Sequence, residues 1–304
     1  MRISDIAMQH ILLQGFQNAQ EAAQTRQIQL ASGDKYQTYG EYGADALRLV
    51  SADSVIARAG AFENAATVAL TRLETQGASL EIVSDAVEQS RAGFIRSLAV
   101  GNAEQLLPDL EIAAQRIITA LNVDFGGVFV FGGTDGARPP VNAATLSDVA
   151  AAGPIDGLFN EGERTSLTVE EGVSVDGGAL ASEIARDLLV ELQELGNAEA
   201  MLGPFQGELT AAQRDFLLEK SVRFAELADA LYREQGLSAV AQGQASDAVT
   251  RNVKARELAE IVAAQIEDVD IAEALSALNQ DQLAIQASAR ALADASQLSL
   301  LNFI

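Results

Sequence analysis

The sequence contains no cysteine and no tryptophan, and it has one histidine and 5 prolines in 304 residues. Without cysteine the chain can form no disulfide, no thiolate nucleophile and no cysteine-ligated metal site. The single imidazole, His10, lies between Gln9 and Ile11, which indicates a surface or interface residue rather than a catalytic base. Aromatic residues make up only 5 %, and alanine supplies much of the 48 % apolar fraction. This composition is typical of long, closely packed helices rather than of a thick globular core.

Positive charge is also scarce: the chain has 43 acidic and 20 basic residues, and its net charge is −23. Such a surface argues against binding nucleic acid or an anionic membrane. The charge is unevenly spread: residues 1–33 are neutral, residues 274–304 carry −1, and the remaining −22 lies between them. We therefore expect the two ends of the chain to be buried against neighbours.

Long apolar runs are missing as well. Asp5, Gln9, His10 and Gln14 interrupt the N-terminal stretch, so we expect no cleaved secretory signal. A membrane-spanning helix needs about 18 or more consecutive apolar residues, so none is expected and no membrane insertion is predicted.

Helical periodicity covers most of the chain. Residues 1–31 have apolar side chains at spacings of three and four, which predicts a first helix. The stretch 32–43, with three glycines and three tyrosines, predicts a loop, and Asp45 a helix N-cap. Residues 46–100 contain no proline and predict a helix of about 80 Å, which needs a partner along its whole length.

A partner helix is predicted over residues 103–122, with Pro108 in its first turn. Helical texture returns over residues 179–196 and again from Ala211 toward Asp270, where Gly236 and Gly243 suggest interruptions. Thr210 and Gln213 form a predicted capping box before that second run.

The final segment has the clearest seam. Apolar positions alternate by four and three residues, which predicts a coiled-coil face with one polar member; the members are Ile271, Leu275, Leu278, Gln282, Ile285, Ala289 and Leu292. The buried face of an ordinary globular helix would explain the same spacing nearly as well. The apolar end LSLLNFI, residues 298–304, favours a docking surface.

The middle of the chain differs in texture. Residues 125–136 bracket a short β-like run, Val128–Phe131, between two glycine pairs, and residues 137–178 are rich in Gly, Pro, Asn and Asp. Residues 165–169 and 173–175 predict a β-hairpin. We expect a small β-rich inserted domain over residues 133–179, too short for a sizeable core of its own.

Catalytic and metal-binding patterns are weak. FGGTDG, residues 131–136, lacks the spacing and the lysine of a phosphate loop. The acidic cluster at 267–270 lacks the ligand ladder and turn glycine of an EF-hand. We therefore expect no enzyme, no cofactor and no metal site.

Four segments resemble the bacterial flagellin superfamily, and within it the hook-associated protein 3 family. They are MRIS (1–4), LASG (30–33), LNVDFGGVFVFGGTDG (121–136) and LAIQASARALADASQLSLLNFI (283–304). The third resembles the family's N-x-x-x-G-x-Y-L-F-G-G-T segment, with Phe129 and Val130 at the Tyr and Leu positions. After Gly33 the sequence departs from the superfamily pattern and reads DKYQTYGEYGADA over residues 34–46.

The resemblance implies a mainly α fold in which both halves of the chain form a long antiparallel helical rod or coiled coil around a small inserted domain. Residues 1–44 and 271–304 would be coiled-coil arms in an inner layer, 45–132 and 180–270 the rod, and 133–179 the outer insert. The predicted assembly-interface residues are Ile3, Ile6, Leu12, Leu13, Phe16, Leu30, Ile271, Leu275, Leu278, Ile285, Leu292, Leu298, Leu300, Leu301, Phe303 and Ile304.

The implied function is that of a structural subunit at the junction between flagellar hook and filament. Its partners would be further copies in a ring, a neighbouring hook-associated protein, flagellin and an export chaperone. It would be exported by the flagellar type III route to the extracellular flagellum. Two alternatives stay open: the chain is flagellin itself, or the insert binds a ligand or carries an enzymatic activity.

Overall fold

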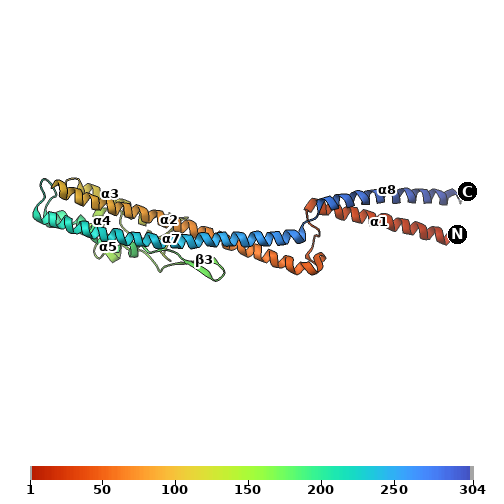
Figure 1. The fold of residues 1–304 in the computed structure, drawn as a ribbon, viewed down its shortest axis with the longest axis horizontal. Helices are drawn as coiled ribbons and strands as arrows, with labels where there is room; N and C mark the ends of the chain where they lie inside the picture. The colour runs from red at the N-terminus through yellow and green to blue at the C-terminus, as the bar shows by residue number, and fades with distance from the viewer. Residues whose placement is uncertain (1, 302–304) are drawn as a thin grey trace. The chain divides into compact units, whose positions relative to one another are not determined.

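The computed structural model describes the backbone of residues 2–301 and the side chains of residues 7, 8 and 10–294. The chain is mainly helical, as the sequence predicts (Figure 1). The elements are α1 (Arg2–Ser32), η1 (Tyr39–Asp45), α2 (Ala46–Val100), α3 (Leu106–Leu121), β1 (Asp124–Phe125), β2 (Val128–Phe129), α4 (Leu146–Ala151), η2 (Ile155–Leu158), β3 (Ser166–Glu170), β4 (Val173–Asp176), α5 (Ala181–Gly196), α6 (Ala198–Leu202), α7 (Ala211–Glu267) and α8 (Ile271–Leu301).

Helix boundaries agree closely with the sequence pattern. The long helix predicted over 46–100 is α2, and α3 has Pro108 in its first turn. The capping box is confirmed: Gln213 N donates to Thr210 Oγ1 at 3.2 Å and Thr210 N to Gln213 Oε1 at 2.9 Å. The interruptions suggested at Gly236 and Gly243 are wrong, since α7 continues through both. A glycine costs a helix only about 1 kcal/mol, which packing along one face outweighs.

The segment between α1 and α2 differs from the prediction. Residues 39–45 form the 3-10 turn η1 rather than an open loop, and Asp45 lies within that turn. Its carboxylate accepts a hydrogen bond from Arg48 Nη1 at 2.9 Å, so it is not the N-cap that the sequence predicts. The backbone is non-helical at Gly43, with φ 57° and ψ −117°, so Asp45 already lies inside the helical run that follows this kink and continues into α2.

The contacts divide the chain into two compact units, one of residues 1–58 and 255–304 and one of residues 59–254. In the second unit α2 and α7 run side by side (Figure 1). The main core lies among α2, α3, α5 and α7, and its largest members include Phe94, Phe131, Phe224 and Leu189. A smaller, alanine-rich cluster joins α2 and α7 to the strands β3 and β4. Small residues at this contact let the two long helices approach closely.

The predicted hairpin is confirmed, with Leu167 opposite Val175 in the antiparallel pair β3–β4. The same insert also contains the short helix α4 and the turn η2, and Val141, Val149 and Ile155 join the main core. Of the β-like run 128–131 only Val128–Phe129 forms a strand, paired with β1 across a two-residue turn. That turn is Gly126–Gly127, both with positive φ, as a type I′ hairpin requires.

In the first unit α1 and α8 run side by side in opposite directions (Figure 1). Leu49 and Ala52 of α2 pack with Ala263 and Ile266 of α7 in a small core of this unit. The finer three-part division of the chain stays a prediction. No helix in the part that the structure describes is long and apolar enough to cross a membrane.

Candidate assembly interface

Backbone hydrogen bonds fix the α1–α8 pair at the end where α1 finishes and α8 begins. Gly33 ends α1 in the left-handed conformation, with φ +87°, and its N–H returns to Gln29 O at 2.9 Å. Its own carbonyl accepts from Val269 N at 2.8 Å, just before α8 begins. Lys35 N donates to Glu267 O at 2.7 Å, and Lys35 Nζ caps the end of α7 at Gln265 O, 3.1 Å. A cation there also complements the negative end of the helix dipole.

The inner face of α1 follows the predicted spacing. Leu12, Phe16, Ala19 and Leu30 are half-buried and Ala23 is buried, which places them on the side of α1 that is turned away from solvent. One-sided burial of this kind is what a helix with a single partner shows. The pattern predicted for residues 1–31 is therefore confirmed over the described side chains.

The seam of α8 differs in part from the prediction. Leu278, Ile285 and Leu292 are half-buried as expected, but the other predicted members are exposed, namely Ile271, Leu275, Gln282 and Ala289. The alternate seam positions are Ala274, Asp281 and Ser288, which are buried or half-buried. Both sets alternate by three and four residues with Leu278 and Ile285, so spacing alone does not separate them. Small side chains such as Ala274 and Ser288 lie inward, where they leave room for a closely approaching helix.

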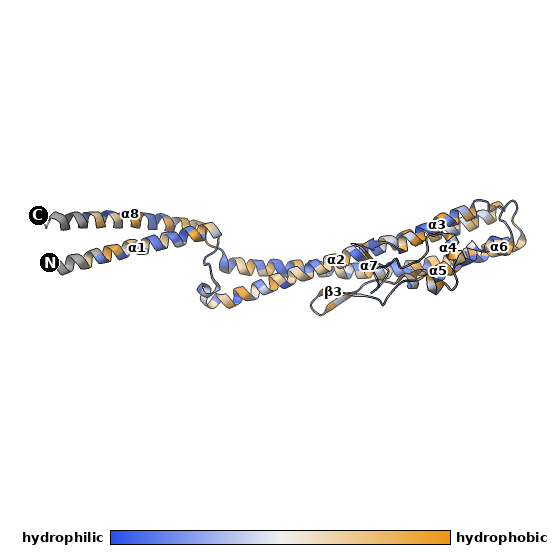
Figure 2. Ribbon diagram, turned by 180° about the vertical axis from the view of Figure 1, so that it is seen from behind, coloured by the Kyte–Doolittle hydropathy of each residue, from blue (hydrophilic) through white to orange (hydrophobic). Residues whose placement is uncertain are grey.

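Both arms also expose apolar side chains. On α1 these are Met8, Ile11, Leu13 and Ile28, and on α8 they are Ile271, Leu275 and Leu283, with Ile11 64 % and Leu283 65 % exposed. Figure 2 shows orange and blue residues interspersed along both helices. Several large apolar side chains on a pair of helices that carries almost no charge indicate a surface that another chain covers.

The predicted interface residues accordingly fall into three groups. Leu12, Phe16, Leu30, Leu278, Ile285 and Leu292 are half-buried within the unit. Leu13, Ile271 and Leu275 are exposed. Phe303 and Ile304 lie outside the described residues, and the side chains of Ile3, Ile6, Leu298, Leu300 and Leu301 lie outside the described side chains. Their role in assembly stays a prediction.

The FGGT segment, residues 131–134, packs closely against residues 162 and 163 of the insert. Phe131 is fully buried, Thr134 N donates to Glu163 O at 3.0 Å, and Glu163 N donates to Thr134 Oγ1 at 3.0 Å. Gly162 N reaches Gly132 O at 3.0 Å. The segment therefore uses its glycines for close backbone packing.

Charged residues of the insert pair with one another or with nearby backbone. Arg164 contacts Glu183 at 2.8 Å and Asp176 at 3.2 Å. Asp156 pairs with Arg186, and Glu161 Oε2 accepts from Ser182 N at 3.0 Å. These contacts attach the insert to the N-terminal part of α5. They give the acidic and basic side chains of the insert a structural use.

The acidic cluster near residue 270 also serves local structure. Asp270 Oδ1 accepts from Ala272 N at 2.9 Å and Glu273 N at 3.1 Å, so it caps the N-terminus of α8. Burial raises the pKa of Glu267, and the neighbouring carboxylates of Asp53 and Asp34 raise it further. Among the described residues no group of three or more His, Cys, Asp or Glu side chains is arranged to hold a metal ion.

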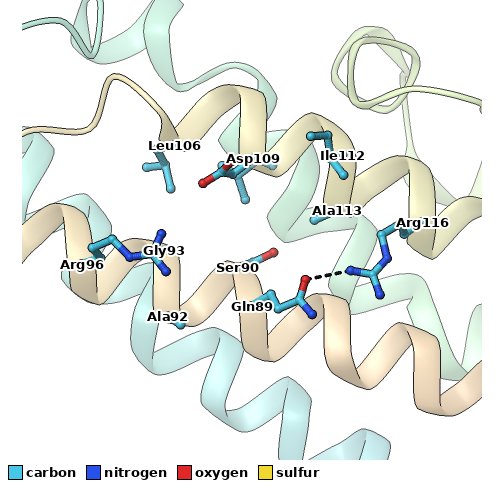
Figure 3. A pocket seen from close by; sticks show the side chains of 11 residues that line it. Gln89, Ser90, Ala92, Gly93, Arg96, Leu106, Asp109, Ile112, Ala113 and Arg116 are labelled. Atoms are coloured by element: carbon cyan, nitrogen blue, oxygen red, sulfur yellow. Dashed lines mark hydrogen bonds between the residues drawn. The ribbon is translucent and has the colours of Figure 1, made fainter.

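A groove runs between α2 and α3 in the second unit (Figure 3). Two hollows of about 280 and 390 Å³ form it, and both are lined by Ile112 and Arg116. Arg116 Nη1 donates to Gln89 Oε1 at 2.7 Å, across the groove. The sequence did not predict this groove, because its lining depends on how closely two separate helices approach.

Two comparisons with known proteins bear on this arrangement. Residues 233–304 match the family model of the bacterial flagellin C-terminal helical region. Over these residues the chain is similar to the flagellins. The matched residues are the C-terminal part of α7 together with α8, which is the helix that pairs with α1. This match supports a structural role in the bacterial flagellum.

The fold is also similar to a solved structure, that of a Vibrio parahaemolyticus protein assigned as a flagellar hook-associated protein. The TM-score is 0.59 at 13 % sequence identity, and the match covers 73 % of this chain and 97 % of the other. At this identity the similarity concerns the fold. No curated protein sequence matches the chain.

Proposed function

We propose that the chain is the structural subunit that joins the flagellar hook to the filament, the role of hook-associated protein 3. The observation that carries the proposal is the charge-poor α1–α8 pair, whose outer sides expose apolar residues such as Ile11 and Leu283. Covering a side chain of this size contributes roughly 1.5–3 kcal/mol, and an assembly repeats each contact in every subunit. The flagellin-type C-terminal region and the hook-associated fold support the same role.

In this role the arms form the inner layer and the protein carries out no catalysis. Its partners are further copies in a ring, a neighbouring hook-associated protein on one side and flagellin on the other. Export through the flagellar type III route, assisted by a chaperone, brings the chain to the extracellular flagellum. The absence of cysteine is compatible with passage of an unfolded chain.

Electron microscopy of a strain lacking the gene tests the proposal. We expect hooks without attached filaments, and flagellin shed into the medium. Restoring the full chain should restore attachment, whereas a chain lacking residues 284–304 should not. Normal filament attachment by the truncated chain would contradict the proposal.

Flagellin itself is the second candidate, which the family match to a flagellin C-terminal region favours. The two roles differ in what the purified protein does alone. A filament subunit polymerises into long filaments and dominates the protein of sheared flagella. A junction subunit forms no long filament and is a minor component of the same preparation.

A further inference from the structure

The α2–α3 groove is lined by more basic than acidic side chains, although the protein is strongly acidic. Arg96 and Arg116 line it against a single acidic residue, Asp109, over the length that Figure 3 shows. Neither arginine forms an ion pair with a described residue. With acidic residues twice as frequent as basic ones in the chain, two unpaired guanidinium groups beside one groove favour an acidic occupant.

The groove also offers apolar surface. Ile82 and Ile112 line it and are partly exposed, at 42 % and 59 %. Along α3 it follows a helix of 16 residues, which is about 24 Å at 1.5 Å per residue. A groove of this length and lining suits an amphipathic helix that carries acidic residues.

The outer face of α7 has these properties. We define the α7 stripe as Asp215, Leu218, Glu219, Val222, Glu226 and Asp229, all of which are exposed and lie on one face of α7, at successive spacings of three, one, three, four and three residues. Leu218 and Val222 are its apolar members, at 57 % and 54 % exposure. From Asp215 to Asp229 the stripe is about 21 Å long, close to the length of the groove.

The stripe and the groove lie on different surfaces of the second unit. Phe224 and Leu231, on the opposite side of α7 from the stripe, are buried in the core. The groove is lined by α2, by α3 and by Val123, which follows α3, and by no residue of α7. One chain therefore presents both complementary faces at once, and the two cannot meet within one molecule.

We propose that the α7 stripe of one copy docks into the α2–α3 groove of the next copy. Asp215 and Glu219 would lie near Arg96 and Arg116, with Leu218 and Val222 against Ile82 and Ile112. Such a contact joins two different faces, so repeating it generates a ring or a helical array rather than a closed pair. This inference rests on the proposed function and names the surfaces through which neighbouring copies meet.

Cysteine cross-linking tests the contact directly, because the chain has no cysteine of its own. Three double variants are made, each with two cysteines in the same chain. Each carries Ile112→Cys together with one substitution in the α7 stripe: Leu218→Cys, Val222→Cys or Glu226→Cys. Sheared flagella with their hooks are treated with a flexible bis-maleimide. We expect a ladder of cross-linked copies from at least one pair, and no ladder from any single-cysteine chain. The matched control pairs Ile95→Cys with Val222→Cys, since Ile95 is exposed on α2 outside the groove lining.

A charge swap tests the pairing without depending on the register. Arg96→Glu with Arg116→Glu should prevent incorporation into flagella, and adding Asp215→Arg with Glu219→Arg should restore it. Unchanged thermal unfolding of each purified chain shows that the variants fold.

Several results overturn the inference while leaving the proposed function intact. These are flagella that contain the chain but give no ladder from any pair, a control ladder of equal strength, and a cross-link from Ile112→Cys to another protein. The inference is also overturned if adding Asp215→Arg and Glu219→Arg to the Arg96→Glu, Arg116→Glu chain does not restore its incorporation into flagella. Absence of the chain from hooks and filaments would overturn the proposed function, and this inference with it.

Discussion

Phe94 of α2 and Phe224 of α7 meet edge to face, with ring centroids 5.0 Å apart and planes at 87°. Both side chains are fully buried, and they join two helices that are far apart in the sequence. An edge-to-face pair of this kind contributes roughly 0.5–1.5 kcal/mol beyond the apolar area that it buries.

Truncating either ring should therefore destabilise the second unit strongly. We expect Phe224→Ala to lower the free energy of unfolding by about 3–5 kcal/mol, because a cavity replaces the ring. A double-mutant cycle with Phe94→Ala should give a coupling energy of about 1 kcal/mol, measured by urea denaturation followed by circular dichroism. Ile95→Ala is the control, since that exposed neighbour should change stability by less than about 0.5 kcal/mol. A coupling energy near zero would show that the Phe94 and Phe224 rings do not stabilise each other.

A buried lysine, Lys220, joins α7 to α5 in the second unit through ion pairs. Lys220 Nζ contacts Glu191 Oε2 at 2.6 Å and also Glu194, and Arg223 Nε approaches Glu191 Oε1 at 3.1 Å. Only 1 % of the Lys220 side chain and 8 % of the Glu191 side chain are exposed. We expect Lys220→Met to cost about 3 kcal/mol, because Glu191 would then remain buried with one partner fewer. The half-exposed Glu194 is the control, and Glu194→Gln should cost less.

The same lysine gives an alkaline pH dependence. Burial lowers the pKa of Lys220, but its hydrogen bonds to Glu191 and Glu194 outweigh burial and leave the pKa above its ordinary value of 10.5. Stability from a raised lysine pKa is present below the unfolded-state pKa and is lost as pH rises through the folded-state value. The free energy of unfolding should therefore fall above about pH 10.5, and less steeply in Lys220→Met. Equal slopes in the two chains would contradict this role.

The sequence was sufficient to predict the long helices, because α1 and α8 repeat apolar residues at spacings of three and four and because α2 contains no proline. It was insufficient for the α8 seam, where Leu275 and Ala274 fit the same spacing and only packing decides which lies inward. The β1–β2 hairpin was missed although Gly126–Gly127 was a usable signal. The α2–α3 groove and the α7 stripe depend on which helices pack together, and local sequence patterns do not predict helix pairing.

Two glycines with similar backbone angles allow strain and crowding to be separated. Gly126 has φ +63° and open space where a Cβ would lie, whereas Gly133 has φ +60° and faces Glu163 O and the Leu180 side chain. Gly126→Ala should cost about 1–2 kcal/mol from the left-handed backbone alone. Gly133→Ala should cost about 2–4 kcal/mol, because overpacking adds to that strain. Chemical denaturation of both chains measures the difference, and equal losses would show that the FGGT segment relaxes freely.

The outer faces of the terminal arms provide the last prediction. Leu13 and Leu283 are exposed, at 42 % and 65 %, so replacing either with aspartate removes few contacts within the chain. Leu13→Asp and Leu283→Asp should therefore leave thermal unfolding of the purified protein within about 0.5 kcal/mol of the parent. In an assembly that covers these side chains, an unpaired carboxylate would be buried and strongly disfavoured. We expect each variant to abolish filament attachment in cells, as counted by electron microscopy. Gln17→Asp, at an exposed polar position of α1, is the matched control. Normal attachment by both leucine variants would show that these faces stay in solvent, and it would remove the exposed leucines from the assembly surface.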